Sequence, residues 1–248
     1  MSAPFISDPL FYLTAIPAVL IYGIGKGGLG GALGVVAVPM MALTVPVQQA
    51  AAILLPTLLA MDVFAVRYHY KFADYCVLKM MIMPALIGIL LAGIYMKGGG
   101  DREMEFLVGI ISLLFVILYL VDWLPKKKPG TLSAYFWSLF SGFTSTTIHS
   151  GGGPASIYLL PLKLDKRCLV ATMAVFFASV NFFKLIPYLW LDLLSLTNIS
   201  TALTLIPLAP VGVAIGARLL DVVSETWVYR LCYTFLFLSG VALIWRAW

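Results

Sequence analysis

Apolar residues form long runs along the whole chain, and charged residues, glycines and prolines separate these runs. A helix needs about 20 apolar residues to cross the hydrocarbon core of a bilayer, and several of the runs reach that length. The apolar segments cover residues 10–25, 28–45, 47–66, 75–97, 103–123, 132–148, 151–162, 168–190, 199–217 and 226–246. The pattern predicts an all-α, polytopic membrane protein with about five helical segments in each half.

Two of the apolar segments contain glycine clusters that interrupt them. The first cluster ends at Gly31, eight residues before Pro39, and the second ends at Gly153, eight residues before Pro161. Interrupted apolar segments at matching places in two halves are typical of the binding sites of transporters built from internal repeats. The glycine clusters are therefore the first candidates for a functional site.

The two halves align with each other at an offset of 122 residues. This offset superposes Gly31 on Gly153 and Asp62 on Lys184, and a slip of one residue then superposes Pro84 on Pro207. The order of the matches along the chain predicts an internal repeat. We expect a first membrane repeat at 1–124, a basic connection at 125–130 and a second membrane repeat at 131–248.

Basic residues predict the orientation of the segments. Lys and Arg gather in the loops 67–74, 124–130 and 163–167, whereas 1–9 and 191–198 contain none. Loops rich in Lys and Arg are cytoplasmic in most membrane proteins. Equivalent loops of the two halves then face opposite sides, so the repeats are inverted. Both termini are predicted to be periplasmic or extracellular.

The glycine-interrupted segments are short for a membrane crossing. The segments 10–25 and 28–45 have about 16–18 residues each, and 151–162 is shorter still. They are either tilted full spans or re-entrant hairpins that reach the middle of the membrane. We favour short, partly re-entrant helices, because a broken backbone is tolerated at membrane depth only where protein buries it or a polar cavity solvates it.

Composition narrows the class of function. Hydrophobic residues make up 62% of the chain and charged residues 11%, whereas about a quarter of a soluble protein is charged. The net charge of +5 comes from loops beside apolar segments, so it indicates orientation rather than nucleic-acid binding. Cys76, Cys168 and Cys232 are scattered. We therefore expect no disulfide framework, no metal site and no cofactor.

The two glycine clusters predict an anion site where the hairpin tips meet. The second arm of each hairpin begins at its glycines, so its free N–H groups and positive dipole end would point into the protein. Lys26 lies within the first cluster and His149 precedes the second. An ionisable residue at membrane depth indicates function. A small anion with several oxygens fits these groups.

The candidate site residues come from both clusters and from the helix after the second one. The expected substrate-binding residues are Lys26, Gly27, Gly28, Gly30, Gly31, Thr146, Thr147, His149, Ser150, Gly151, Gly152, Gly153 and Asn181. Thr144 and Ser145 add hydroxyl donors, and Ser150 could cap the helix that follows it. His149, Asp62 and Lys184 are candidates for coupling or gating. No catalytic residue is expected.

Structural alternatives exist for the residues near the glycine clusters. Glycines in membrane helices often serve close packing alone. The hydroxyls of Thr146 and Thr147 could bond to their own backbone. Lys26 could extend toward the membrane surface, and His149 could be a packing residue.

The deeper charged residues also have simple alternatives. Asp62 could form an interfacial ion pair with Arg67, and this is the expectation we favour for it. Lys184 is expected to extend toward the outer surface, beside an aromatic belt of Tyr188 and Trp190. Asn181 lies one turn deeper than Lys184 and is expected to face the cavity.

The duplicated pattern resembles the sulfite exporter TauE/SafE family. The resemblance rests on Gly28–Gly31 with Pro39, and on Ser150–Pro154 with Pro161, and it covers essentially the whole chain. It implies a bacterial inner-membrane transporter of sulfur-containing anions such as sulfite, sulfoacetate or other sulfonates. The first cluster departs from a plain glycine triplet, with Leu29 inside it and Lys26 ahead of it, which leaves the exact substrate open.

These observations favour a secondary transporter that moves a small sulfur-containing anion by alternating access. A passive anion channel and a transporter of a non-sulfur anion are the alternatives. A membrane-embedded enzyme is disfavoured, because His149 and Ser150 have no suitably placed carboxylate. The expected partners are the anion and the lipid bilayer, and the chain could also assemble as a homo-oligomer.

Overall fold

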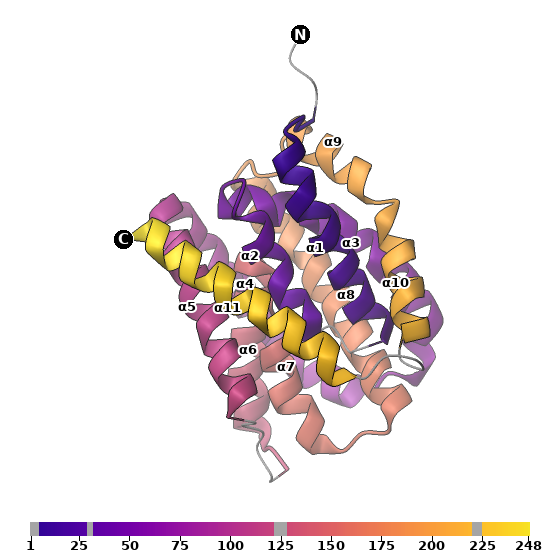
Figure 1. Ribbon diagram of the computed structural model, residues 1–248. Helices are drawn as coiled ribbons and strands as arrows, with labels where there is room; N and C mark the ends of the chain where they lie inside the picture. Colours follow the sequence, from indigo (N-terminus) through magenta and orange to yellow (C-terminus); the bar gives the residue numbers. More distant parts are fainter. Residues whose placement is uncertain (1–4, 29–31, 122–127, 220–224) are drawn as a thin grey trace.

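The computed structural model describes residues 5–28, 32–121, 128–219 and 225–248, and these are helical with short connections (Figure 1). The first half contains α1 (Pro9–Gly28), η1 (Ala32–Val36), α2 (Ala37–Met41), α3 (Val47–His69), η2 (Tyr70–Phe72), α4 (Tyr75–Gly98) and α5 (Asp101–Leu120). The second half contains α6 (Thr131–Ile148), α7 (Gly152–Leu159), η3 (Leu160–Leu162), α8 (Lys166–Trp190), α9 (Leu196–Leu205), α10 (Leu208–Leu219) and α11 (Glu225–Ala247). No strand occurs in these ranges. The predicted all-α class is confirmed.

Several helices have the length and hydropathy of membrane spans. Within the described residues, α1, α3, α4, α5 and α8 meet both conditions, and α9 with α10 forms a further candidate bent by 44°. The predicted segment 199–217 therefore contains two helices, with a break between Leu205 and Leu208. Pro207 lies at the break, and proline removes a helix hydrogen bond and clashes with the preceding turn.

The first and the last described residues of the chain lie at one end of the bundle, which we name the terminal end. The Ile6 N–H donates to Thr201 Oγ1 at 3.0 Å, and Arg246 Nη1 donates to Ala42 O at 2.9 Å. At the opposite end, named the basic end, the Asp74 N–H donates to Thr172 Oγ1 at 2.9 Å. The predicted topology also places the two ends of the chain on the same side of the membrane. Which side of the membrane each end of the bundle faces stays a prediction.

Close helix contacts at glycine occur in both halves. A side chain at Gly27 of α1 would collide with Val213 O of α10, and one at Gly142 of α6 would collide with Ala85 O of α4. The repeat alignment relates α1 to α6 and α10 to α4. These two tightly packed pairs are therefore equivalent, as an inverted repeat requires, although the inversion itself stays a prediction.

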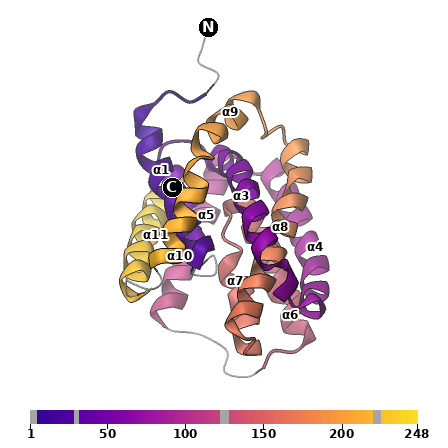
Figure 2. The same cartoon turned by 90° about the vertical axis from the view of Figure 1, so that its right-hand side faces the viewer.

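The central helices α3 and α8 pack against each other and position the interior of the protein. Figure 2 shows α4, α6 and α7 on one side of the bundle and α1, α5, α10 and α11 on the other. In the second half, α6 ends at the glycine turn and α7 with η3 returns toward the basic end. In the first half, η1 with α2 forms the corresponding return arm. Each arm is much shorter than the roughly 20 residues of a crossing, as expected for a partly re-entrant hairpin.

Candidate functional site

Five polar side chains meet inside the bundle, and we name them the central polar cluster: Lys26, Asp62, His149, Asn181 and Lys184. They come from the end of α1, from α3, from the turn after α6, and twice from α8. Lys184 is fully buried, and the exposed fractions of Asp62, His149 and Asn181 are only 4%, 1% and 2%. Buried polar and charged groups are costly unless they are paired, so this cluster is a candidate functional site.

The acidic part of the cluster centres on the Asp62 carboxylate. Asp62 Oδ1 pairs with Lys26 Nζ, and Asp62 Oδ2 accepts from Asn181 Nδ2. The predicted ion pair between Asp62 and Arg67 is wrong. Residues five apart on a helix do not share a face, whereas residues three or four apart do, so Arg67 points away from the direction of Asp62.

The basic part of the cluster centres on the Lys184 ammonium. Lys184 Nζ lies 2.8 Å from Ser145 O, 3.1 Å from Ser145 Oγ and 2.7 Å from His149 Nδ1. The expected extension of Lys184 toward the membrane surface is therefore wrong. Three acceptors inside the bundle replace the water that the ammonium loses, so it can remain buried.

The hydrogen bonds of His149 determine which of its ring nitrogens carries the proton. His149 Nε2 lies 2.8 Å from Ala51 O, and a carbonyl oxygen only accepts. Nε2 must therefore donate, which leaves Nδ1 to accept from Lys184. This network describes a neutral imidazole that joins α3 to α8.

A sharp turn after α6 places His149 in the interior. His149 has a left-handed backbone with φ 53°, and its N–H donates to Ser145 O at 3.1 Å. A side chain at Gly151 would lie 2.7 Å from Ser141 O, so glycine lets the turn rest against α6. Tyr22 of α1 donates to His149 O at 3.2 Å. The turn is thus held from both hairpins.

Several predicted site residues have structural contacts instead. Thr146 and Thr147 donate to Gly142 O and Phe143 O of their own helix, at 2.8 and 3.1 Å. This is the alternative in which the hydroxyls bond to their own backbone. Gly27 packs against α10, as described above.

The glycine turn itself differs in one respect from the expectation. Gly151, and not Ser150, is the N-cap of α7, and no side chain caps this helix. The Ser150 hydroxyl is buried without a hydrogen-bond partner among the described residues. Gly152 begins α7, and a side chain at Gly153 would collide with the Phe115 ring of α5. Gly28 ends α1, while Gly30 and Gly31 lie outside the described residues.

Two tyrosines near the cluster were missed or misplaced by the sequence analysis. Tyr188 is fully buried and donates to Thr146 O at 2.7 Å, so its expected place in an outer aromatic belt is wrong. Trp190 is exposed, and Lys97 Nζ lies 4.1 Å from its ring centre. Tyr22 was not among the candidates. Its position one helical turn before Lys26, on the same face of α1, was the available signal.

The central polar cluster contains more basic side chains than acidic ones. With both lysines counted as protonated, Lys26 and Lys184 outnumber the carboxylate of Asp62, and the hydrogen bonds describe His149 as neutral. The formal sum is about +1, in surroundings where charges interact more strongly than in water. Such a cluster can stabilise a buried anion. Within the described ranges, no three His, Cys, Asp or Glu residues could jointly hold a metal ion.

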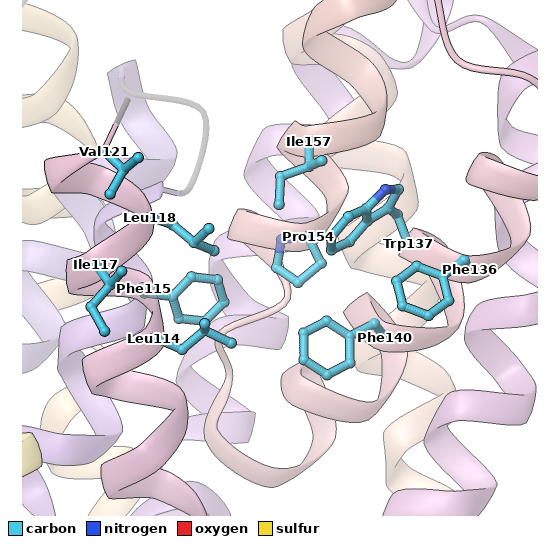
Figure 3. Close-up of a pocket in the computed structure, with 10 residues that line it drawn as sticks. All are labelled: Leu114, Phe115, Ile117, Leu118, Val121, Phe136, Trp137, Phe140, Pro154 and Ile157. Atoms are coloured by element: carbon cyan, nitrogen blue, oxygen red, sulfur yellow. The ribbon is translucent and has the colours of Figure 1, made fainter. Parts of the chain in front are cut away.

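An apolar groove lies on the second half, between α5 and α6, with α7 as its floor (Figure 3). Its volume is about 450 Å³. The lining residues are Leu114, Phe115, Ile117, Leu118, Val121, Phe136, Trp137, Phe140, Pro154 and Ile157. Since Phe115 packs on Gly153, its ring separates the groove from the glycine turn.

Comparison with known proteins decides the family. The family model described as Sulfite exporter TauE/SafE matches residues 15–243. The chain belongs to the sulfite exporter TauE/SafE family. This is a family of membrane transporters rather than enzymes, so the chain is a multi-pass membrane protein, in agreement with its apolar helices. No curated protein and no solved structure matches the chain.

Proposed function

We propose that this chain is a secondary transporter that moves a small sulfur-containing anion across the bacterial inner membrane by alternating access. The substrate class is sulfite, sulfoacetate or another small sulfonate. The anion binds between the two hairpin tips, at the central polar cluster. The observation that carries this proposal is a group of two lysines and a single carboxylate, largely buried, beside a glycine-broken helix.

The donors around the cluster suit an anion with several oxygens. Lys26 and Asn181 both donate to the Asp62 carboxylate. These two donors therefore already bind an anionic group with two oxygens, which is part of the protein itself. The Ser150 hydroxyl has no partner among the described residues, and the first turn of α7 leaves N–H groups without partners inside the helix. A sulfite or sulfonate group presents three oxygens to such donors.

Unequal packing of the two return arms supports alternating access. In the first half, α11 packs against both η1 and α2. In the second half, the equivalent helix α5 is separated from much of α7 by the apolar groove, as Figure 3 shows. In a transporter with inverted repeats, exchange of two such arrangements would close one side and open the other.

Transport in proteoliposomes tests the proposal. Wild-type protein should release radiolabelled sulfite with saturable kinetics, and Lys26→Ala should reduce the initial rate by at least about 100-fold, because it removes a buried charge facing the anion. Lys97→Ala is the matched control, since Lys97 is exposed at the terminal end and lies over the Trp190 ring. Wild-type rates in Lys26→Ala would reject the proposed site.

The same assay separates the alternatives. A channel would give flux that does not saturate with sulfite concentration, whereas a transporter must saturate. Competition by unlabelled sulfoacetate, but not by acetate, would identify a sulfur-oxyanion substrate. Competition by acetate alone would favour a transporter of non-sulfur anions.

A further inference from the structure

We propose that Asp62 is a built-in counter-ion that occupies the place of the transported anion, and that anion binding displaces it and loads it with one proton. The inference rests on the proposed function and adds the coupling ion to it. In this scheme the anion and the proton are taken up together, and both leave together. No bond other than the carboxyl O–H is made or broken.

The geometry gives Asp62 and an incoming oxyanion the same partners. Both carboxylate oxygens are used, one by the Lys26 ammonium and the other by the Asn181 amide. A carboxylate and a sulfonate are both anionic oxygen acceptors, so they compete for these two donors. Without an anion, Lys26 and Asn181 both have the Asp62 carboxylate as their partner. An anion can therefore bind Lys26 only after Asp62 has moved away.

The charges explain why a proton accompanies this exchange. A displaced Asp62 carboxylate would remain buried without its two partners, which is strongly unfavourable. One proton neutralises it and changes it from an acceptor into a donor that can hydrogen-bond to the anion. The balanced step is a carboxylate plus an anion plus a proton giving a carboxylic acid beside the bound anion. A monoanion then leaves the formal charge of the cluster unchanged.

The other titratable groups facing Asp62 are less suited to take this proton. They are Tyr22 and Lys26 from α1 and Lys184 from α8, and His149 lies next to Lys184. Both lysines already donate hydrogen bonds, Lys26 to Asp62 and Lys184 to Ser145 O, and both ring nitrogens of His149 are used, by Ala51 O and by Lys184. The ionisable residues of α5 and α10 that could approach α3, Glu105 and Arg218, lie near helix ends, and Glu105 pairs with Arg246. Asp62 is the remaining acceptor.

Calorimetry with methanesulfonate tests the inference, because this probe stays a monoanion over the whole pH range used. Full-length protein in nanodiscs is titrated between pH 5.5 and 8.5 in buffers of different ionisation enthalpy. The wild type should take up about one proton per anion, and its affinity should fall as the pH rises, by up to about tenfold per pH unit. Asp62→Asn should bind at every pH with no proton uptake, at least as tightly as the wild type at low pH.

Two variants make the outcome specific. Asp62→Glu keeps an ionisable group and should retain proton uptake. This variant therefore separates the effect of losing the ionisable group from the effect of changing the size of the side chain. Thermal unfolding of each variant confirms that it is folded. Anion binding without proton uptake in the wild type, or unchanged pH dependence in Asp62→Asn, would overturn this inference alone. Absence of any methanesulfonate or sulfite binding by the wild type would overturn the proposed function, and this inference with it.

Discussion

The two glycine-broken hairpins carry different ionisable pairs at equivalent places. In the first half, Lys26 at the break pairs with Asp62 of α3. In the second half, His149 at the break accepts from Lys184 of α8, and the repeat alignment superposes Asp62 on Lys184. Both halves thus place one ionisable group at the break and one on the central helix. One half has a carboxylate paired with a lysine and an amide, and the other has a lysine held by neutral acceptors.

The return arms of the two hairpins differ as well. The arm η1–α2 lies under α11, whereas α7 faces the apolar groove beside α5. The two return arms therefore have different surroundings. The halves thus share their order of helices and differ in their ionisable residues and in the packing around their return arms. Substitutions in each half test this difference.

The largest effect is expected for Lys184→Met. This substitution removes the fixed cation and leaves Ser145 and His149 without their shared donor. Unpaired buried acceptors cost about 1–3 kcal/mol each, so we expect a lower melting temperature as well as loss of sulfite binding. Thermal unfolding with and without sulfite measures both. Retained binding with normal stability would show that the second half contributes no cation to the site.

Gly27→Ala should be the next most severe change. The new methyl group meets the backbone oxygen Val213 O, which cannot move without shifting α10, so we expect destabilisation of about 1–3 kcal/mol or more. Ala18, buried on the same helix, gives a control in Ala18→Gly, whose smaller cost comes from helix propensity and lost packing rather than overpacking. Thermal denaturation in detergent compares the two variants. A larger loss for Ala18→Gly would contradict the packing role of Gly27.

Gly153→Ala tests the equivalent region of the second half and should cost less. Its methyl group meets the ring of Phe115, a side chain that can rotate toward the groove. We expect a loss of about 1 kcal/mol, and Phe115→Leu in the same chain should recover part of it. A double-mutant cycle of melting temperatures measures this coupling. Additive effects of the two substitutions would show that the ring and the turn do not interact.

The smallest effect on stability is expected for Leu118→Trp, which fills the apolar groove. Leu118 is half-buried at the lining, so a larger ring can enter without displacing the core. If the groove must close during transport, sulfite flux should fall about tenfold, while sulfite affinity changes by less than about twofold. Flux in proteoliposomes and binding by calorimetry provide the two readouts. Leu114→Trp at the same groove offers a second site, and normal flux in both variants would exclude closure of the groove.

Local pattern was sufficient to predict much of the fold. The apolar segments correspond to helices, because hydropathy and helix length depend on neighbouring residues. The glycine turn at Gly151–Gly153 was also predictable, since glycine allows a close backbone approach that other residues obstruct. The break between α9 and α10 lies at Pro207, and proline is a local signal for such a break.

Only the tertiary structure decided how the charged residues pair. Asp62 binds Lys26 and Asn181, which are 36 and 119 residues away, instead of its near neighbour Arg67. Lys184 remains buried because Ser145 and His149 replace the water around its ammonium group. These acceptors lie outside α8, so the sequence of α8 does not predict them. The physical reason is general. The hydrophobic pattern of neighbouring residues determines where the helices form. The pairing of buried charges depends instead on which helices meet in space.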